Sequence, residues 1–231
     1  YRSCYFILKG ITFMKFFFLA AFIVVSVIHL YASLKCNAKL RAQTKVFILP
    51  FLLGWYWCSA AEPYAVVIWA IVFSWLGDVL LIPDGKAWFT AGGIAFMLSH
   101  AFFVAAYNES VNFSVVPIWA IILAAAVYLT ASVLVFKGLR PHLPTFMFYP
   151  MFFYLLVNGA MNCFALYQLV SKPCAATAIT FIGATQFFVS DSTLFYVRFK
   201  KNGRLKTHFV VMLTYIIAEF LIVLGLEMLG I

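Results

Sequence analysis

Long apolar runs separated by brief polar connections constrain this chain more than any other feature. A helix needs about 20 mostly apolar residues to cross the hydrocarbon core of a bilayer. Eight candidate segments follow one another along the chain: 12–31, 46–61, 64–82, 87–107, 114–136, 145–170, 174–197 and 208–229. Turn-forming residues interrupt them, as in Pro83-Asp84-Gly85 and Asn202-Gly203. The sequence therefore predicts an all-α, polytopic transmembrane bundle of about eight helices.

Composition points the same way. The chain has 231 residues, of which 66% are hydrophobic and only 10% are charged. No long polar stretch could form a second domain, so we expect residues 1–231 to make a single transmembrane domain. The first apolar run also resembles a signal peptide, but it lacks a clear cleavage site, and we interpret it as an uncleaved first helix.

The basic residues indicate an orientation, not a nucleic-acid partner. The formal net charge is +9, but Lys and Arg fall in short loops beside apolar runs. Twelve of the sixteen would lie on one side if the segments alternate: Lys35, Lys39, Arg41, Lys45, Lys86, Lys137, Arg140, Arg198, Lys200, Lys201, Arg204 and Lys206. Basic loops stay in the cytoplasm, so this side is predicted to be cytoplasmic. Two sequons, at Asn108 and Asn112, share a loop on the predicted lumenal side.

Two aspartates lie inside stretches that otherwise read as membrane-spanning helices. The chain has only seven acidic residues, and Asp78 and Asp191 are placed in apolar surroundings. An ionisable group at membrane depth costs roughly 2.5–3.5 kcal/mol on insertion scales and indicates a functional site. The alternative is that each aspartate is a hydrogen-bonded packing residue between helices.

Helix rise places several polar groups at one depth. Asp78, Asp191 and Tyr215 each lie about 9–10 Å inside the predicted cytoplasmic edge, at 1.5 Å per residue. Ser190 adjoins Asp191, and His100 lies deeper in its segment. If these helices face a common centre, the groups form a polar cleft that opens to the cytoplasm. An equally good interpretation is that three further polar residues only hold helices together through hydrogen bonds: Gln186, Asn158 and Asn162.

A metal or other cofactor is not expected. The four histidines lie in separate segments without an HxxxH companion, and the five cysteines show no CxxC spacing. The SxxxD spacing of Ser74 and Asp78 also occurs in zinc-dependent membrane hydrolases, but those need three histidines.

Several segments together resemble the YhhN-like family of membrane proteins, whose characterised vertebrate members are lysoplasmalogenases. The matching pieces are TKVFILP at 44–50, SWLGDVLLI at 74–82, FTAGGIAFMLSHAFFVAAY at 89–107, GATQFFVSDSTLFYVRF at 183–199 and TYIIAEFLIVLG at 214–225. The family pattern places functional weight on Lys45, Asp78, His100, Asp191 and Tyr215. This chain departs from that pattern at Val46 (usually Pro), Phe103 (usually Tyr) and Glu219 (usually Gln).

The resemblance implies an eight-helix enzyme of internal membranes, and the expected location is the endoplasmic reticulum. It would cleave the vinyl ether of a lysoplasmalogen to a fatty aldehyde and a glycerophospho-base. Paired carboxylates suit this chemistry, because one can donate a proton while the other stabilises the oxocarbenium ion. Asp78 and Asp191 are the expected catalytic residues. The residues expected to bind substrate are Lys45, His100, Tyr215, Ser190 and Arg198, of which Arg198 reads equally well as an orientation anchor.

Two other functions stay open from the sequence. Intramembrane acids and a histidine also build proton-coupled transporters of lipids or small molecules, although we see no inverted repeat. A lipid-binding scaffold would leave the two acids unexplained. The expected partners are a lysophospholipid substrate and membrane lipid, and the sequence allows a homodimer.

The charge asymmetry generates a first prediction. A cysteine introduced at position 204 should be labelled by an impermeant maleimide from the cytoplasmic side of sealed vesicles, whereas one at position 112 should be labelled only after permeabilisation. Labelling of position 204 from the lumenal side alone would reverse the orientation.

Overall fold

The chain forms a bundle of helices. The computed structural model describes residues 2–200 and 208–231, with side chains from Thr12 onward. Its α-helices in this part are α1 (Arg2–Leu34), α2 (Ala38–Ser59), α3 (Ala65–Leu80), α4 (Lys86–Asn108), α5 (Ile118–Leu139), α6 (Phe148–Ser171), α7 (Ala175–Phe199) and α8 (Phe209–Leu229). Two short 3-10 turns, Arg140–His142 and Thr145–Met147, connect α5 to α6. The predicted all-α fold class is confirmed.

The predicted start of the second helix is wrong. The candidate segment began at residue 46, but α2 begins at Ala38. Asn37 explains the difference, because its side chain accepts a hydrogen bond from the backbone N–H of Leu40 at 3.1 Å and so caps the helix. Lys45 therefore lies on an ordered helix and not in a loop. The first helix also begins earlier than predicted, at Arg2.

Five segments in the described residues are long and apolar enough to cross a membrane: 12–34, 86–108, 118–142, 145–171 and 209–229. Helix α3 is apolar but has 16 residues, about 24 Å at 1.5 Å per residue. Helices α2 and α7 carry many of the polar residues described below. Large apolar side chains such as Ile122, Leu123 and Val127 of α5 are exposed on the outside, as expected where a bundle faces lipid.

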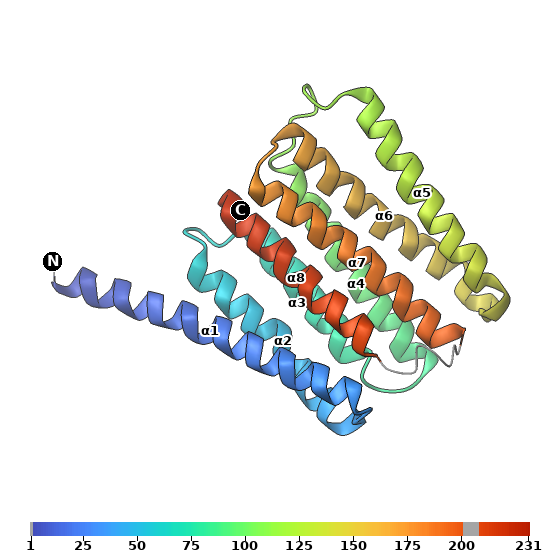
Figure 1. The fold of residues 1–231 in the computed structure, drawn as a ribbon, viewed down its shortest axis with the longest axis horizontal. Helices are drawn as coiled ribbons and strands as arrows, with labels where there is room; N and C mark the ends of the chain where they lie inside the picture. The colour runs from blue at the N-terminus through green and yellow to red at the C-terminus, as the bar shows by residue number, and fades with distance from the viewer. Residues whose placement is uncertain (1, 201–207) are drawn as a thin grey trace.

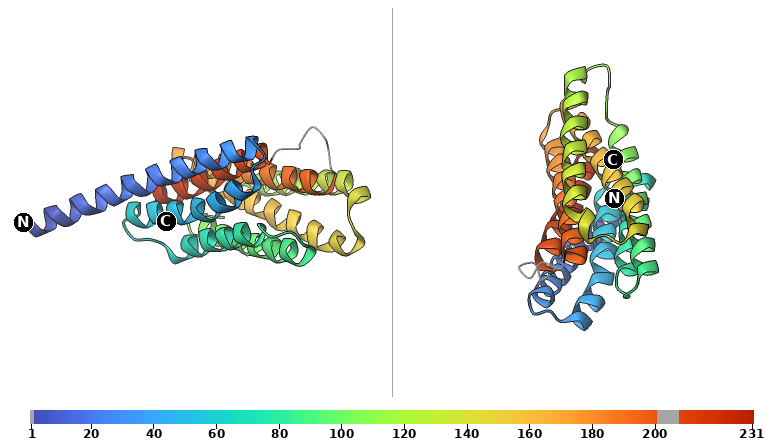
Figure 2. Two further views of the ribbon diagram at one scale, coloured as in Figure 1. Left: turned by 90° about the horizontal axis from the view of Figure 1, so that it is seen from below. Right: turned by 90° about the vertical axis from the view of Figure 1, so that its right-hand side faces the viewer.

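Consecutive helices pack as antiparallel pairs: α1 with α2, α3 with α4, α5 with α6, and α7 with α8 (Figure 1). Contacts of α4 with α6, α6 with α7, and α2 with both α3 and α8 join the pairs. Helix α5 lies at one edge of the bundle and α1 lies at the opposite edge. The start of α1 extends past the ends of the other helices (Figure 2).

The connections 35–37, 81–85 and 140–147 gather at one end of the bundle, which we call the basic end (Figure 1). Arg41, Lys45, Lys86 and Arg198 lie near it. Lys201, Arg204 and Lys206, which the orientation prediction uses, lie outside the described residues.

Glycines allow the closest helix pairs to approach. A Cβ on Gly183 of α7 would lie 2.8 Å from the backbone nitrogen of Ile222 and 3.0 Å from the carbonyl oxygen of Ala218, both in α8. Gly92 of α4 lies opposite Gly77 of α3, with 3.2 Å between its Cβ position and the Gly77 carbonyl oxygen. Small residues at such contacts let two backbones come close. The α7–α8 contact sets the position of Asp191 relative to Tyr215.

Gly183→Ala should therefore destabilise the protein by about 1–3 kcal/mol, because a methyl group there must push two helix backbones apart. The matched control is Gly93→Ala in α4, where a Cβ meets no atom within 4 Å. That change should be neutral or slightly stabilising, since Ala favours helix by up to about 1 kcal/mol. Unfolding of the two purified variants in the same detergent compares them. Equal stability would contradict the packing argument.

Candidate active site

A polar cavity of about 90 Å³ lies between helices α2, α3, α4, α7 and α8 near the basic end. Asp78 and Asp191 both line it, together with Tyr215. It also has a cationic rim of Arg41, Lys45 and Arg198, and His208 lines the cavity beside them. The structure thus brings together groups from separate helices that the depth argument placed at one level.

Asp78 of α3 is almost fully buried, at 1% exposure, and it has a cation as a partner. Lys45 Nζ lies 3.1 Å from its Oδ1, which forms an ion pair between α2 and α3. The hydroxyl of Tyr215 in α8 donates to its Oδ2 at 2.9 Å. A buried carboxylate needs such partners, because an unpaired charge in an apolar interior is costly. The Asp78 carboxylate is therefore stabilised in its ionised form by Lys45 and Tyr215.

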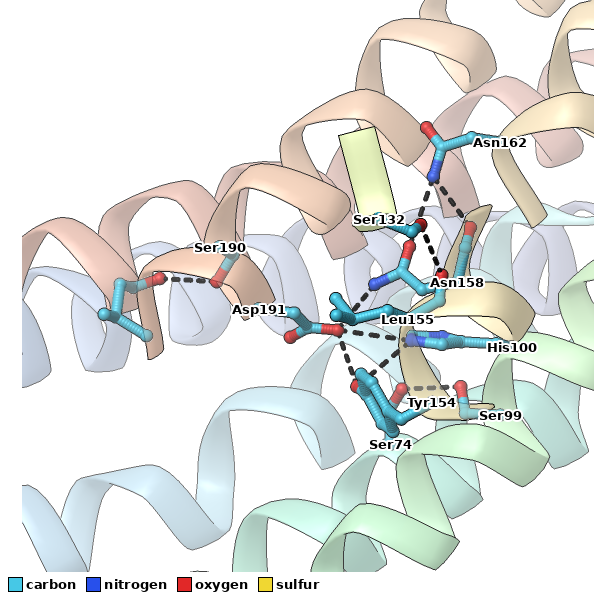
Figure 3. A network of polar contacts seen from close by, with 11 residues as sticks. Ser74, Ser99, His100, Ser132, Tyr154, Leu155, Asn158, Asn162, Ser190 and Asp191 are labelled. Carbon is cyan, nitrogen blue, oxygen red and sulfur yellow. Dashed lines mark hydrogen bonds and ion pairs between the residues drawn. The ribbon is translucent and has the colours of Figure 1, made fainter. Parts of the chain in front are cut away.

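Asp191 of α7 has hydroxyl, amide and imidazole partners instead, and they converge on one oxygen (Figure 3). Its Oδ2 accepts hydrogen bonds from the Tyr154 hydroxyl at 2.6 Å and from Asn158 Nδ2 at 2.7 Å. His100 Nε2 lies 3.3 Å from the same oxygen. His100 donates there when its proton is on Nε2, and its Nδ1 has no partner among the described residues. Asp191 also lines the cavity.

A second set of contacts holds these donors in place. Asn162 Nδ2 donates to the backbone oxygen of Asn158 at 3.0 Å and to its Oδ1 at 3.2 Å, which fixes the amide so that Nδ2 faces Asp191. The ring of Phe187 packs edge-on against His100, with centroids 4.7 Å apart, and against Tyr215, at 5.5 Å. This buried ring lies between the partners of the two aspartates and makes the site rigid and apolar around its charges.

Two predicted substrate-binding residues have structural partners of their own. Ser190 lines the cavity, but its hydroxyl donates to the backbone oxygen of Val211 at 2.9 Å and ties α7 to α8. Arg198 also lines the cavity, and its Nη1 lies 3.8 Å from Oδ1 of the exposed Asp84. Gln186 is half-buried and is absent from the cavity lining.

Three residues of the site were not predicted as part of it: Tyr154, Arg41 and His208. Tyr154, Asn158 and Asn162 follow one another at four-residue spacing, so a polar stripe along one face of α6 was the available signal. Arg41 Nε is buried without a partner among the described residues. Burial, together with the positive charges of Arg41, Lys45 and Arg198, lowers the pKa of His208 to about 4, so this side chain is neutral at pH 7.

Glu219 of α8 is fully buried beside this site. Ser74 and Tyr215 neighbour its carboxyl group, but neither of its oxygens accepts a hydrogen bond from a described residue within normal geometry. Ser74 is instead bonded to Ser99 at 2.7 Å. Within the described residues, no three His, Cys, Asp or Glu side chains come together as a metal-binding group.

These features define a multi-pass helical membrane protein with a buried carboxylate site that opens at the basic end. The chain belongs to the YhhN family, whose model matches residues 40–226. The match runs from the first turn of α2 into the last turn of α8, so it includes every helix that contributes to the site. No curated protein and no solved structure matches the chain.

The ion pair between Lys45 and Asp78 generates a stability prediction. Lys45→Met should lower the free energy of unfolding by about 3–5 kcal/mol, because it leaves a buried carboxylate unpaired. The double variant Lys45→Met/Asp78→Asn should recover much of that loss. Denaturant titration of the purified variants measures both.

The control is Lys15→Met, which breaks a more exposed pair with Glu227 at the other end of the bundle, 3.5 Å long. That change should cost about 1 kcal/mol or less. A Lys45→Met variant no less stable than Lys15→Met would show that Asp78 does not depend on its cation.

Proposed function

We propose that this chain is a lysoplasmalogenase-like membrane hydrolase, which cleaves the vinyl ether bond of a lysoplasmalogen to a fatty aldehyde and a glycerophospho-base. The observation that carries the proposal is the pair of buried aspartates on one cavity, one with a lysine as partner and the other with a tyrosine hydroxyl, an asparagine amide and a histidine. Membership of the YhhN family supports it. Paired carboxylates divide acid and stabilising roles in other reactions with oxocarbenium character.

Asp191 is assigned as the general acid. Its Oδ1 carries the proton and delivers it to the alkenyl carbon distant from the ether oxygen, which converts the vinyl ether to an oxocarbenium ion. The three donors on Oδ2 then stabilise the negative charge that stays on the carboxylate. Asp78, which is paired with Lys45, is assigned to stabilise the positive charge of the oxocarbenium ion.

Water completes the reaction. The cavity of about 90 Å³ has room for several water molecules. A water attacks the oxocarbenium carbon and returns its proton to Asp191, which restores the acid. The resulting hemiacetal breaks its bond to the glycerol oxygen, and the proton of the hemiacetal hydroxyl passes to that oxygen. One lysoplasmalogen and one water thus give one aldehyde and one glycerophospho-base.

The cationic rim suits the phosphate of the lysolipid. Lys45 is engaged by Asp78, so Arg41 and Arg198 are the cations assigned to the phosphate. The unpartnered Nε of Arg41 supports this assignment, because guanidinium groups bind phosphate with several donors. Ser190, His100 and Tyr215 then act by positioning the helices and the aspartates.

Hydrolysis of an ester-linked lysolipid is not supported by the site. Ester cleavage by a serine enzyme needs a hydroxyl nucleophile on the free nitrogen of the His–Asp pair. His100 Nδ1 has no such partner among the described residues, and Ser99 is bonded to Ser74.

We further propose an endoplasmic reticulum location, with lipid or a second copy of the chain covering the exposed face of α5.

The aspartates provide the test. Asp78→Asn and Asp191→Asn should each lower aldehyde release from lysoplasmalogen about a hundredfold or more, since general acid–base groups contribute about 10²–10⁴. The double variant should be little worse than the worse single variant, because the two act as a unit. Rates are normalised to monodisperse protein, and a chelator in the assay should leave the wild-type rate unchanged.

Glu227→Gln, a carboxyl change at the opposite end of the bundle, is the control and should keep full activity. Near-normal turnover in either well-folded Asn variant would remove that aspartate from the mechanism. Fatty acid release without aldehyde would mean a different reaction. No release from any lipid, with uptake driven by a pH gradient in proteoliposomes, would favour the transporter.

A further inference from the structure

A second cavity, of about 100 Å³, lies between α4, α6 and the end of α7. Unlike the polar cavity, it is almost wholly apolar: Gly93, Met97, Met151, Phe153 and Phe195 are among its walls. Phe153 is 57% exposed and Ile94, also in the lining, is 50% exposed, so the cavity opens on the lipid-facing side of the bundle. We call it the α4–α6 groove.

The groove and the polar cavity share wall residues with a third, smaller space. A narrow space of about 20 Å³ lies between them, and Phe96 and Leu194 line both this space and the polar cavity. Gly93 and Tyr154 line both this space and the groove. Phe89 borders all three. These three neighbouring spaces therefore adjoin one another between the bilayer side of the protein and the cationic rim.

Tyr154 marks the point where the groove reaches the reacting groups. Its ring forms part of the groove wall, while its hydroxyl donates to Asp191 at 2.6 Å. A molecule that fills both spaces would thus place its apolar part along α4 and α6, and the carbon next to its polar part beside Asp191. The anionic end of that molecule would meet Arg41 and Arg198.

We propose that the α4–α6 groove binds the aliphatic chain of the substrate, which enters sideways from the membrane between α4 and α6. This inference rests on the proposed function for the position of the vinyl ether. The groove holds the part of the chain nearest the alkenyl bond, because its volume is too small for a whole lipid tail. A groove of about 100 Å³ has room for part of one chain, and this favours lipids with one chain over those with two.

Two features of the walls suit an aliphatic chain. A Cβ on Gly93 would meet no atom within 4 Å, so this position leaves the groove open where it joins the narrow space. Met97, Met147 and Met151 add flexible side chains that adapt to different chains. Filling the groove at Gly93 should therefore block the chain without touching either aspartate.

The first experiment compares Gly93→Leu with wild type on two vinyl ether lysolipids, one with a long chain and one truncated to a few carbons. The ratio of kcat/KM for the long substrate to that for the short one should fall about tenfold or more in Gly93→Leu. Ala126→Leu, a similar enlargement on the exposed face of α5, should leave the ratio unchanged. An unchanged ratio in well-folded Gly93→Leu would overturn the inference.

The second experiment does not depend on hydrolysis. A lysophospholipid with a saturated ether chain and a diazirine close to the glycerol is photolysed with the protein in detergent, and labelled peptides are mapped by mass spectrometry. Labels at α4 and α6 residues of the groove, reduced by Gly93→Leu, are the expected result. Labels confined to the outer face of α5, or to the apolar hollow beside Pro50 and Trp75, would overturn the inference.

The two proposals can fail separately. Labelling of the groove without any aldehyde release by wild type would refute the vinyl ether reaction but keep the groove as a chain-binding site. Aldehyde release with labels elsewhere would do the reverse.

Discussion

The burial of two carboxyl groups in an apolar bundle is the constraint on which the rest of the structure depends. Each group must receive partners from neighbouring helices, because water cannot supply them at that depth. Asp78 in α3 takes its partners from α2 and α8, and Asp191 in α7 takes them from α4 and α6. Six helices are therefore tied to two side chains. Among the side chains that the structure describes, those of α1 and α5 provide no direct partner, and these two helices lie toward the edges of the bundle (Figure 1).

The partners also make the two aspartates different. A lysine on one and a hydroxyl, an amide and an imidazole on the other give two similar side chains separate surroundings, which is how acid–base pairs obtain distinct roles. Phe187 lies against a partner of each, His100 and Tyr215, so the two sets of contacts share an apolar wall. A displacement of one set of contacts would therefore move the Phe187 ring against the other set.

Much of this arrangement could be predicted from the sequence, and the parts that could not be predicted have a physical cause. Apolar length predicted the helices, and helix rise placed Asp78, Asp191 and Tyr215 at one depth. Rotation about each helix axis, however, is set by packing. The contact of Tyr154 with Asp191 was missed for that reason, although its spacing from Asn158 was visible. Lys45 was expected to bind substrate and not to pair with Asp78, because the Asn37 cap that extends α2 to include it went unrecognised.

The contact between Arg198 and Asp84 has a consequence for how an anionic molecule would arrive. Asp84 is fully exposed and the two groups are 3.8 Å apart, so solvent and dissolved ions screen their attraction strongly. An incoming phosphate can exchange with Asp84 at Arg198 more readily than it can replace Asp78 at the buried Lys45. At the rim of the cavity, Asp84 is thus a replaceable counter-ion of Arg198, whereas Asp78 stays in place as the counter-ion of Lys45. Ligand exchange at the surface can proceed while the charge balance at the reacting centre stays intact.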